Sequence, residues 1–307
     1  MKKTKVCIVG SSGYIGSHLI SNLKQSYKII AHSRKRIRDK NFYKAVNKII
    51  TGDIRLNSTI NKILISKPDV IIYTISYNHF TSEENLSSSI GNNYEPFQNL
   101  VKHIVEKKIR TKLIYFSTMQ VYGRNYNKKL ITEKYPKDIQ NIYALTHSMC
   151  EDLLQAYEKN LNYCVLRLSN SFGMPKISGL NCWWPVLNNL CKSAKENKKI
   201  IINSDGSPLR DFISLDDISN FLKIVINKSI SEKIINLCSS ETLSIKELAM
   251  LIQKNRYFKK KIPIIIKKKT TNLKNKKFKY SNKIMLKNGF KKINTLNKQI
   301  ETFLSEI

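Results

Sequence analysis

The sequence is poor in acidic residues, in glycine and in long apolar runs. It has 22 Asp and Glu against 54 Lys and Arg, and only 10 glycines among its 307 residues. No apolar stretch approaches the roughly 20 residues that a membrane-spanning helix requires. The short apolar run near the N-terminus lacks the length and the cleavage site of a signal peptide. We therefore expect a soluble, cytoplasmic protein without a transmembrane segment, built as one large domain or two smaller ones.

The cysteines follow neither a CxxC pattern nor the His/Cys spacing of a metal site. They are Cys7, Cys150, Cys164, Cys182, Cys191 and Cys238. We expect reduced, structural thiols in a reducing compartment, and no metal.

The positive charge is spread over the whole chain. The formal net charge is +32, and the many lysines accompany many isoleucines and asparagines, which is typical of an AT-rich genome. One stretch, residues 254–292, contains sixteen Lys or Arg and no acidic residue. Such a stretch matches a polyanion, either nucleic acid or an anionic membrane surface. Its aromatics are sparse and no nucleic-acid module is recognisable, so we favour a solvated basic face, do not expect nucleic acid as a partner, and leave peripheral membrane contact open.

A glycine-rich turn organises the N-terminal part of the chain. The segment 10–16 reads GSSGYIG, follows the apolar run 6–9 and leads into a stretch with helical spacing. Closely spaced glycines between a strand and a helix expose backbone N–H groups at the helix N-terminus, where a pyrophosphate is favoured. The candidate cofactor contacts are Gly10, Ser12, Gly13, Tyr14, Ile15 and Gly16. A tight turn without a ligand is the alternative, and the turn's place before alternating strands and helices disfavours it.

Short apolar runs recur between segments of helical spacing. They cover residues 5–9, 27–32, 47–50, 69–75 and 111–116. This alternation predicts an α/β protein with a Rossmann-type, doubly wound parallel sheet and a smaller α/β substrate-binding region. We place the dinucleotide-binding (Rossmann) domain at residues 1–165 and the mainly substrate-binding region at 166–307, with the chain crossing back to the first domain.

The end of the second strand indicates which dinucleotide binds. An acidic residue there would bind the adenosine ribose, whereas a cation would pair with a 2′-phosphate. The sequence offers Ser33 and Arg34 and no carboxylate, which favours NADP(H) and leaves NAD(H) open. After the third strand, Asp53 and Ile54 are candidate adenine contacts. A turn or capping role for Asp53 is equally consistent with its position.

Further motifs occur in a fixed order along the chain. They are Gly52-Asp53, the strand 69–73, Ser117-Thr118 with Val121-Tyr122-Gly123, Tyr143, the segments 167–173 and 205–213, and Asp216-Asp217. Together with the glycine turn, they resemble those of the extended short-chain dehydrogenases/reductases, in the NAD(P)-dependent sugar-nucleotide epimerase/dehydratase family. The resemblance runs from end to end and implies a nucleotide-diphosphate sugar as substrate. It also implies a homodimer that uses the tyrosine helix.

The resemblance assigns catalytic roles to Tyr143 as acid/base and to Thr118 as the hydroxyl that orients the reacting oxygen. Where the family has a lysine four residues after the tyrosine, this chain has His147. A histidine can still donate a hydrogen bond to the ribose, but it is largely neutral near pH 7 and helps a phenolate less. Oxidation of a hydroxyl needs a proton acceptor, whereas reduction of a ketone needs only a neutral tyrosine. The change therefore favours reduction.

A second departure lies at Met119-Gln120, where sugar-nucleotide 4,6-dehydratases carry an Asp-Glu pair. Neither side chain can act as a general acid or base, which argues against a dehydratase. By resemblance, Asn170 contacts the substrate and Arg210 pairs with its diphosphate. For Trp183 and Trp184, ordinary packing is favoured over stacking on the nucleotide.

The expected function is NADPH-dependent reduction of a nucleotide-diphosphate 4-keto sugar for polysaccharide biosynthesis, through Tyr143 and Thr118. The first alternative is an NAD-dependent 4-epimerase that uses the same two residues. The second is a catalytically weakened family member that binds the dinucleotide as a sensor or scaffold.

Overall fold

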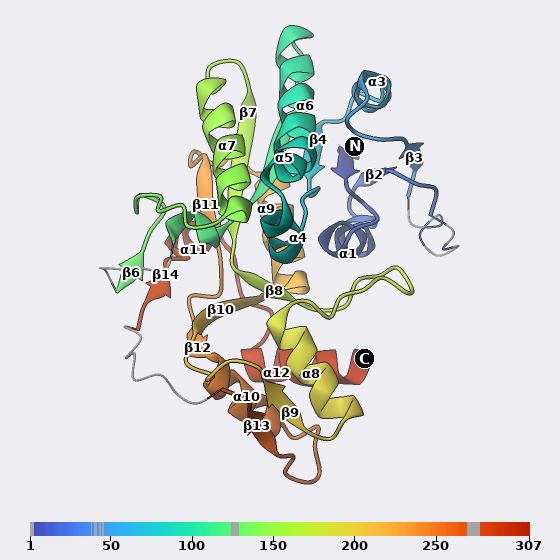
Figure 1. Cartoon of the computed structure of the whole chain (residues 1–307). Coiled ribbons are helices and arrows are strands. Elements are labelled where there is room, and N and C mark those ends of the chain that lie inside the picture. Colours follow the sequence, from blue (N-terminus) through green and yellow to red (C-terminus); the bar gives the residue numbers. More distant parts are fainter. Residues whose placement is uncertain are drawn as a thin grey trace.

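A seven-stranded parallel sheet forms the centre of the molecule (Figure 1). The computed structural model describes residues 3–37, 39, 42, 44, 46–123, 129–268 and 277–307. The strand order is β11-β7-β5-β4-β1-β2-β3, and every neighbouring pair is parallel. Its strands are β1 (Lys5–Val9), β2 (Lys28–Ser33), β3 (Lys48–Thr51), β4 (Val70–Tyr73), β5 (Lys112–Thr118), β7 (Asn162–Leu168) and β11 (Ile234–Leu237). The predicted doubly wound Rossmann-type sheet is confirmed, with strand bounds within a few residues of the apolar runs.

Helices cover both faces of this sheet, so its strands are apolar on both sides. Val6 and Ile8 of β1 pack into one buried cluster, and Cys7 and Val9 pack into the other. The first cluster lies under α1 (Tyr14–Leu23), α9 (Leu215–Asn227) and α11 (Lys283–Lys287). The second lies under α3 (Asn57–Ile65), α6 (Glu95–Glu106) and α7 (Ile142–Ala156).

The connection between β4 and α6 is helical over most of its length. It contains α4 (His79–Glu84), α5 (Leu86–Ser89) and the π-helix η1 (Ile90–Tyr94). Both α4 and α5 contact α7, the helix that carries Tyr143. After β5, the short 3₁₀-helix η2 (Met119–Tyr122) leads the chain toward the same place. The connection after β4, the segment after β5 and the start of α7 thus meet at the carboxyl end of the sheet.

A smaller region lies beyond the carboxyl ends of the strands, at the lower end of the molecule in Figure 1. It contains a three-stranded sheet and a two-stranded sheet around a third apolar cluster. The strands are β8 (Asn170–Phe172), β10 (Leu209–Ser214) and β12 (Thr242–Ser244), and β9 (Ile200–Ile202) with β13 (Ile264–Ile266). The helices are α8 (Val186–Glu196), α10 (Ile245–Gln253) and α12 (Leu296–Glu306). A last parallel pair joins β6 (Leu130–Ile131) to β14 (Lys279–Tyr280).

The chain passes between the two regions more than once. After β10 it returns to the large sheet as α9 and β11, and then leaves again for β12 and α10. Residue 165, the boundary placed from the sequence, lies inside β7. The division into residues 1–165 and 166–307 stays a prediction.

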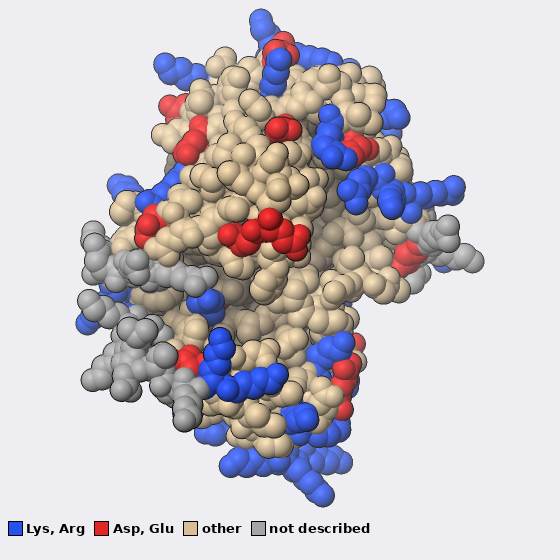
Figure 2. All heavy atoms as spheres, viewed as in Figure 1, with Lys and Arg blue, Asp and Glu red and all other residues tan. Residues whose placement is uncertain are grey.

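All six cysteines are buried and free, as expected. Within the described residues, no helix is long and apolar enough to cross a membrane. Lysines 198–199 and 259–261 are exposed, and the pairing of β9 with β13 brings these two segments together. Figure 2 shows this end of the molecule rich in Lys and Arg. Residues 269–276 of the basic stretch lie outside the described part; the solvated basic face favoured for the stretch stays a prediction, and peripheral membrane contact stays open.

Candidate active site

The glycine turn between β1 and α1 brings three backbone segments into close approach. Gly10 has φ +91°, and a Cβ there would lie 2.8 Å from Thr74 Oγ1 and from Ile75 Cγ1. A Cβ on Gly16 would clash with the Gly10 carbonyl oxygen, whereas one on Gly13 would lie 3.2 Å from the same atom. Gly10 and Gly16 are therefore needed for packing, and Gly13 is the glycine that can serve a ligand.

The N-terminus of α1 fits a dinucleotide diphosphate. Gly13 is its N-cap, and no side chain caps it or adds an acidic group to the first turn of this described helix. Its first N–H groups therefore need an acceptor, and a phosphate is the group that the helix dipole favours. Ser12 and Ile15 are partly buried beside this end, and Tyr14 is buried.

The carboxyl ends of β2 and β3 carry the residues predicted to bind the adenosine half. Ser33 is buried, and its hydroxyl donates to the carbonyl oxygen of Lys35 at 2.8 Å. Arg34 is exposed beside Asp53 and helps to lower the pKa of that carboxyl group. Both carboxylate oxygens of Asp53 accept from the Arg55 guanidinium, which is the largest cause of its pKa of about 2. Ile54 is buried.

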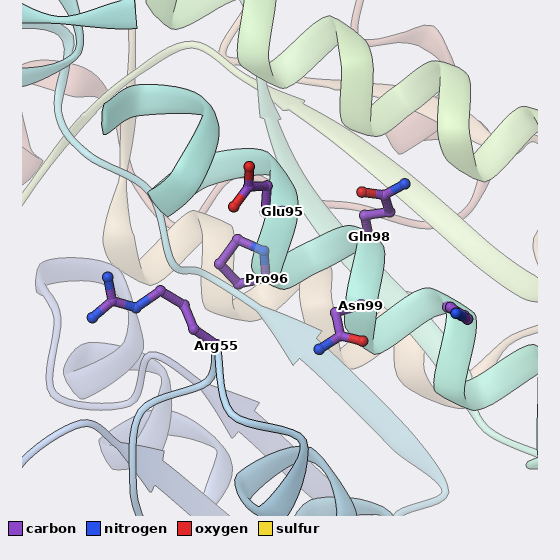
Figure 3. Close-up of a pocket in the computed structure, with 6 residues that line it drawn as sticks. Arg55, Glu95, Pro96, Gln98 and Asn99 are labelled. Atoms are coloured by element: carbon purple, nitrogen blue, oxygen red, sulfur yellow. The ribbon is translucent and has the colours of Figure 1, made fainter. Parts of the chain in front are cut away.

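The structure shows the turn role that the sequence left open for Asp53, and the adenine contact stays a prediction. Its carboxylate binds Arg55 and also accepts the backbone N–H of Arg55 at 3.0 Å, so it shapes the turn after β3. Arg55 also lines a shallow depression with residues of α6, and Figure 3 shows it across from Glu95 and Pro96. None of the residues that line this depression is a predicted catalytic or binding residue. Through Arg55, the depression adjoins Asp53, a residue predicted to bind adenine.

Tyr143 and Thr118 meet as the sequence predicted. Tyr143 lies in the first turn of α7, and Thr118 is the last residue of β5. Burial raises the pKa of Tyr143 to about 12, although a side-chain hydrogen bond with Thr118 opposes that rise. Thr118 Oγ1 also accepts the backbone N–H of Gln120 at 3.2 Å. The two hydroxyls therefore form one unit, in which the phenol keeps its proton.

His147 lies directly beside Tyr143. The two ring centroids are 4.6 Å apart, with an angle of 72° between the ring planes. Burial lowers the pKa of His147 to about 4, and nearby Glu151 only partly opposes this. Its Nδ1 lies 2.7 Å from the Tyr115 hydroxyl and its Nε2 lies 3.2 Å from Ser76 Oγ. Both ring nitrogens thus have protein partners, and the expected hydrogen bond from His147 to a ribose stays a prediction.

A buried ion pair lies one turn further along α7. Glu151 accepts from Arg167 at 2.6 Å and 3.0 Å and from Ser117 Oγ at 2.6 Å. Lys137 approaches the same carboxylate at 3.3 Å, and the Arg167 guanidinium lies 4.7 Å from the Tyr122 ring centroid. Because the carboxylate is fully paired, it adds little net charge at His147 and joins α7 to β5 and β7.

The predicted substrate residues lie on neighbouring strands. Asn170 in β8 donates to the carbonyl oxygen of Asp211 at 3.1 Å, and Arg210 in β10 donates to that of Leu209 at 2.8 Å. Met119 is buried, while the amide oxygen of Gln120 accepts from Asn141 at 3.0 Å. Gln120 therefore supports the residue that caps α7. The structure places no acid or base at the pair of positions 119–120.

The two tryptophans make packing contacts. Trp184 is 44% exposed and its ring meets Tyr14 edge-on at 5.4 Å, while Lys192 lies 4.6 Å from the Trp183 ring centroid. Asn188 Nδ2 is 3.4 Å from the Tyr14 hydroxyl. Tyr14 therefore connects the glycine turn to α8, and Figure 2 shows the surface hollowed between the two regions.

Several residues at the site escaped the sequence analysis. Ser76 follows β4 at the carboxyl end of the strands, where a parallel sheet binds its ligand. Its position in the sequence could therefore have predicted a place in the site. Glu83, whose Oε1 accepts the backbone N–H of Tyr143 at 3.1 Å, lies on a short helix, and Tyr115 lies within an apolar strand. Neither position carried a signal in the sequence. The helix spacing of Glu151 from His147 was visible, but its partner Arg167 is distant in sequence.

Comparison with known proteins agrees with this geometry. The family model "NAD dependent epimerase/dehydratase family" matches residues 6–238. A GDP-6-deoxy-D-talose 4-dehydrogenase from Aggregatibacter actinomycetemcomitans is 24% identical over 251 residues, which cover 81% of this chain and 79% of that protein. A trifunctional UDP-glucose 4,6-dehydratase/UDP-4-keto-6-deoxy-D-glucose 3,5-epimerase/UDP-4-keto-L-rhamnose-reductase from Arabidopsis thaliana is also 24% identical, over 82% of this chain. The chain spans only 40% of the length of that plant protein.

The fold is also similar to that of solved structures. The crystal structure of a UDP-glucose 4-epimerase with UDP-glucose from Thermotoga maritima superposes with a TM-score of 0.84 and covers 98% of both chains. Its sequence identity of 17% makes this a likeness of fold. The family match extends over the glycine turn, Thr118, Tyr143 and β11. The chain belongs to the NAD dependent epimerase/dehydratase family.

Proposed function

We propose that this protein reduces the 4-keto group of a nucleotide-diphosphate sugar, with NADPH as the favoured cofactor. The observation that carries the proposal is the contact of the Tyr143 phenol with the Thr118 hydroxyl and with the buried His147 ring. Tyr143 keeps its proton, with a pKa of about 12, and the imidazole beside it is neutral at physiological pH, with a pKa of about 4. At neutral pH the phenol is therefore present in its protonated, donor form, and almost no phenolate is available to accept a proton from a hydroxyl.

The residues fit distinct parts of such a reaction. The N–H groups at the start of α1 would hold the diphosphate of the dinucleotide, and Arg34 would meet a 2′-phosphate. The bound cofactor supplies the hydride. Tyr143 and Thr118 would converge on the ketone oxygen, where their hydroxyls polarise the carbonyl as negative charge develops. The phenol then gives its proton to that oxygen and regains one from solvent.

The substrate side is proposed from neighbouring positions. Asn170 and Arg210 lie on adjacent strands β8 and β10, which Figure 1 shows below α7, the helix that carries Tyr143. A guanidinium suits a diphosphate because its planar fork donates two parallel hydrogen bonds. The 4-dehydrogenase named above acts, by its name, at carbon 4 of a nucleotide sugar. This supports the class of substrate.

An NAD-dependent 4-epimerase is the second candidate. The fold match to a UDP-glucose 4-epimerase favours it. Such an enzyme must first oxidise a hydroxyl, for which a neutral phenol beside a neutral imidazole is a weak base. The second strand also offers no carboxylate for an NAD ribose.

The deciding experiment measures the fate of the cofactor. The purified protein is given NADPH and a nucleotide-diphosphate 4-keto-6-deoxy sugar, and, separately, the matching 4-hydroxy sugar without added cofactor. The proposal predicts one NADPH oxidised for each keto sugar consumed. Interconversion of C4 epimers with tightly retained NAD would replace it with the epimerase. Binding of a dinucleotide without either reaction would indicate a non-catalytic member of the family.

A further inference from the structure

His147 lies in a chain of hydrogen bonds whose donors and acceptors can be assigned. Ser76 Oγ donates to the carbonyl oxygen of Tyr77 at 2.8 Å and lies 3.2 Å from His147 Nε2. A serine hydroxyl carries a single hydrogen, so Ser76 can only accept at its second contact. The hydrogen between Ser76 and His147 therefore belongs to Nε2.

The protonation of Nδ1 follows from that of Nε2. A neutral imidazole with a hydrogen on Nε2 has a lone pair on Nδ1. The Tyr115 hydroxyl, 2.7 Å away, then donates to Nδ1. Tyr115 and His147 are both buried, and the Tyr115 ring is fixed 4.5 Å from the Phe97 ring. With the Ser76 hydrogen directed to the Tyr77 carbonyl, the Tyr115 hydroxyl donates to Nδ1 in preference to the Cys150 sulfur, a weaker acceptor that also contacts it.

We propose that Tyr115 and Ser76 are positioning residues that hold His147 as the neutral Nε2–H tautomer, with its ring against Tyr143. The effect on catalysis rests on the reductase function proposed above, whereas the tautomer does not. In this arrangement residue 147 is a rigid, uncharged support for the phenol. It supplies no cation to stabilise a phenolate, which suits a site that donates a proton to a ketone.

The neighbouring strand provides a matched control. Tyr73 is aligned with Tyr115 in the pairing of β4 with β5, and it is buried as well. Within the described residues its hydroxyl has no hydrogen-bond partner. Tyr73→Phe and Tyr115→Phe therefore remove the same atom from adjacent buried rings, and only the second change removes a hydrogen bond to His147.

The first measurement is ¹⁵N NMR of the protein with labelled histidine, without cofactor or substrate. The five histidines are distinguished by comparison with His147→Gln. We expect His147 to show a protonated Nε2 and an unprotonated Nδ1, with unchanged shifts between about pH 8 and about pH 5, since an ordinary histidine titrates near 6.5. A protonated Nδ1, or an imidazolium in that range, would overturn the proposal.

The variants then test which residues hold the tautomer. Tyr115→Phe should move the His147 signals toward a mixture of tautomers, and Tyr73→Phe should leave them in place. If Tyr115→Phe does not fold, Ser76→Ala, at a partly exposed position, tests the same lock from the Nε2 side. Unchanged His147 signals in the folded variants would contradict the roles of Tyr115 and Ser76.

The kinetic test separates positioning from substrate binding. Tyr115→Phe should lower kcat for ketone reduction about tenfold, because a small displacement of the phenol is costly. The KM for the sugar should stay nearly unchanged. A tautomer found as expected in a protein that reduces no keto sugar would refute the reductase and leave the lock standing. If the unchanged protein shows the expected tautomer but Tyr115→Phe keeps the same kcat, the tautomer has no effect on catalysis.

Discussion

Glu83 Oε1 accepts a hydrogen bond from the backbone N–H of Tyr143 at 3.1 Å. This contact fastens α4 to the first turn of α7. It places a carboxylate at a helix N-terminus, where the helix dipole favours negative charge. The position of the Tyr143 phenol, the proposed proton donor, therefore depends on a residue sixty positions earlier in the chain.

Changing Glu83→Gln should weaken this attachment. The loss of charge should cost about 0.3–1 kcal/mol of folding free energy. The value of kcat should fall several-fold, because the first turn of α7, which carries Tyr143, is held less rigidly. Thermal unfolding and steady-state kinetics measure the two effects. Glu84→Gln, at the next exposed position of α4, is the control, and equal effects of both changes would show that only the charge of α4 matters.

Replacing Tyr143→Phe removes the proton donor and leaves the ring contact with His147. Turnover should fall by roughly 10²- to 10⁴-fold, while NADPH binding should change little. Single-turnover reduction and a fluorescence titration with NADPH provide the two values. Tyr157→Phe, at the other end of α7, should behave as the unchanged protein. Near-normal turnover in Tyr143→Phe would rule out its role as acid.

The buried His147 should make stability depend on pH. Its pKa is about 4 in the folded protein and near 6.5 in an unfolded chain. Between these values the unfolded chain binds the extra proton, so the free energy of unfolding falls as the pH is lowered. The loss should approach about 3 kcal/mol and should be absent above about pH 7.

His147→Gln can keep hydrogen bonds to both neighbours but cannot titrate. Urea unfolding between about pH 7 and about pH 4 gives the free energy of unfolding at each pH. Its decrease toward low pH should be less steep in the variant, by a slope that corresponds to up to one proton taken up on unfolding. Other buried groups, such as His32 with its lowered pKa, affect both proteins equally. Identical slopes in the two proteins would mean that His147 takes up its proton at the same pH in the folded and unfolded states.

Two glycines of the first turn should respond differently to alanine. Gly16→Ala places a methyl group against the Gly10 carbonyl and should destabilise the fold. Gly13→Ala, whose Cβ would lie 3.2 Å from that carbonyl, should fold and bind the dinucleotide less tightly. Thermal unfolding and cofactor titration distinguish the two, and an unaltered affinity in Gly13→Ala would contradict the diphosphate site.

Arg34→Ala tests the preference for NADPH. The variant should bind NADPH about ten- to a hundredfold more weakly, which corresponds to one lost charged hydrogen bond, and should bind NADH as before. Arg110→Ala is the control for net charge, because Arg110 is exposed just before β5, at the amino end of the parallel strands, whereas Arg34 follows the carboxyl end of β2. An equal loss of affinity for NADPH and NADH would show that Arg34 does not recognise the 2′-phosphate.

The sequence predicted the sheet well because buried parallel strands leave a simple record, a run of apolar residues before a turn. The pairing of Thr118 with Tyr143 was also predictable, through the family motif. The partners of His147 were not. Tyr115 and Ser76 are brought to it by the order of the strands, and periodicity does not show which buried hydroxyl meets which ring nitrogen. For Asp53, the nearby Arg55 was visible but was one cation among many.

The return of α9 and β11 to the large sheet limits how this protein can be divided. A fragment that ended at residue 165 would lack the strand that pairs with β7 and the helix whose Ile218 and Phe221 cover Val6 and Ile8. It would carry an open strand edge and a bare apolar face, both of which promote aggregation. Chimeras that exchange substrate specificity between relatives should therefore replace the separate segments 170–210 and 240–268, and should leave 215–237 with the sheet.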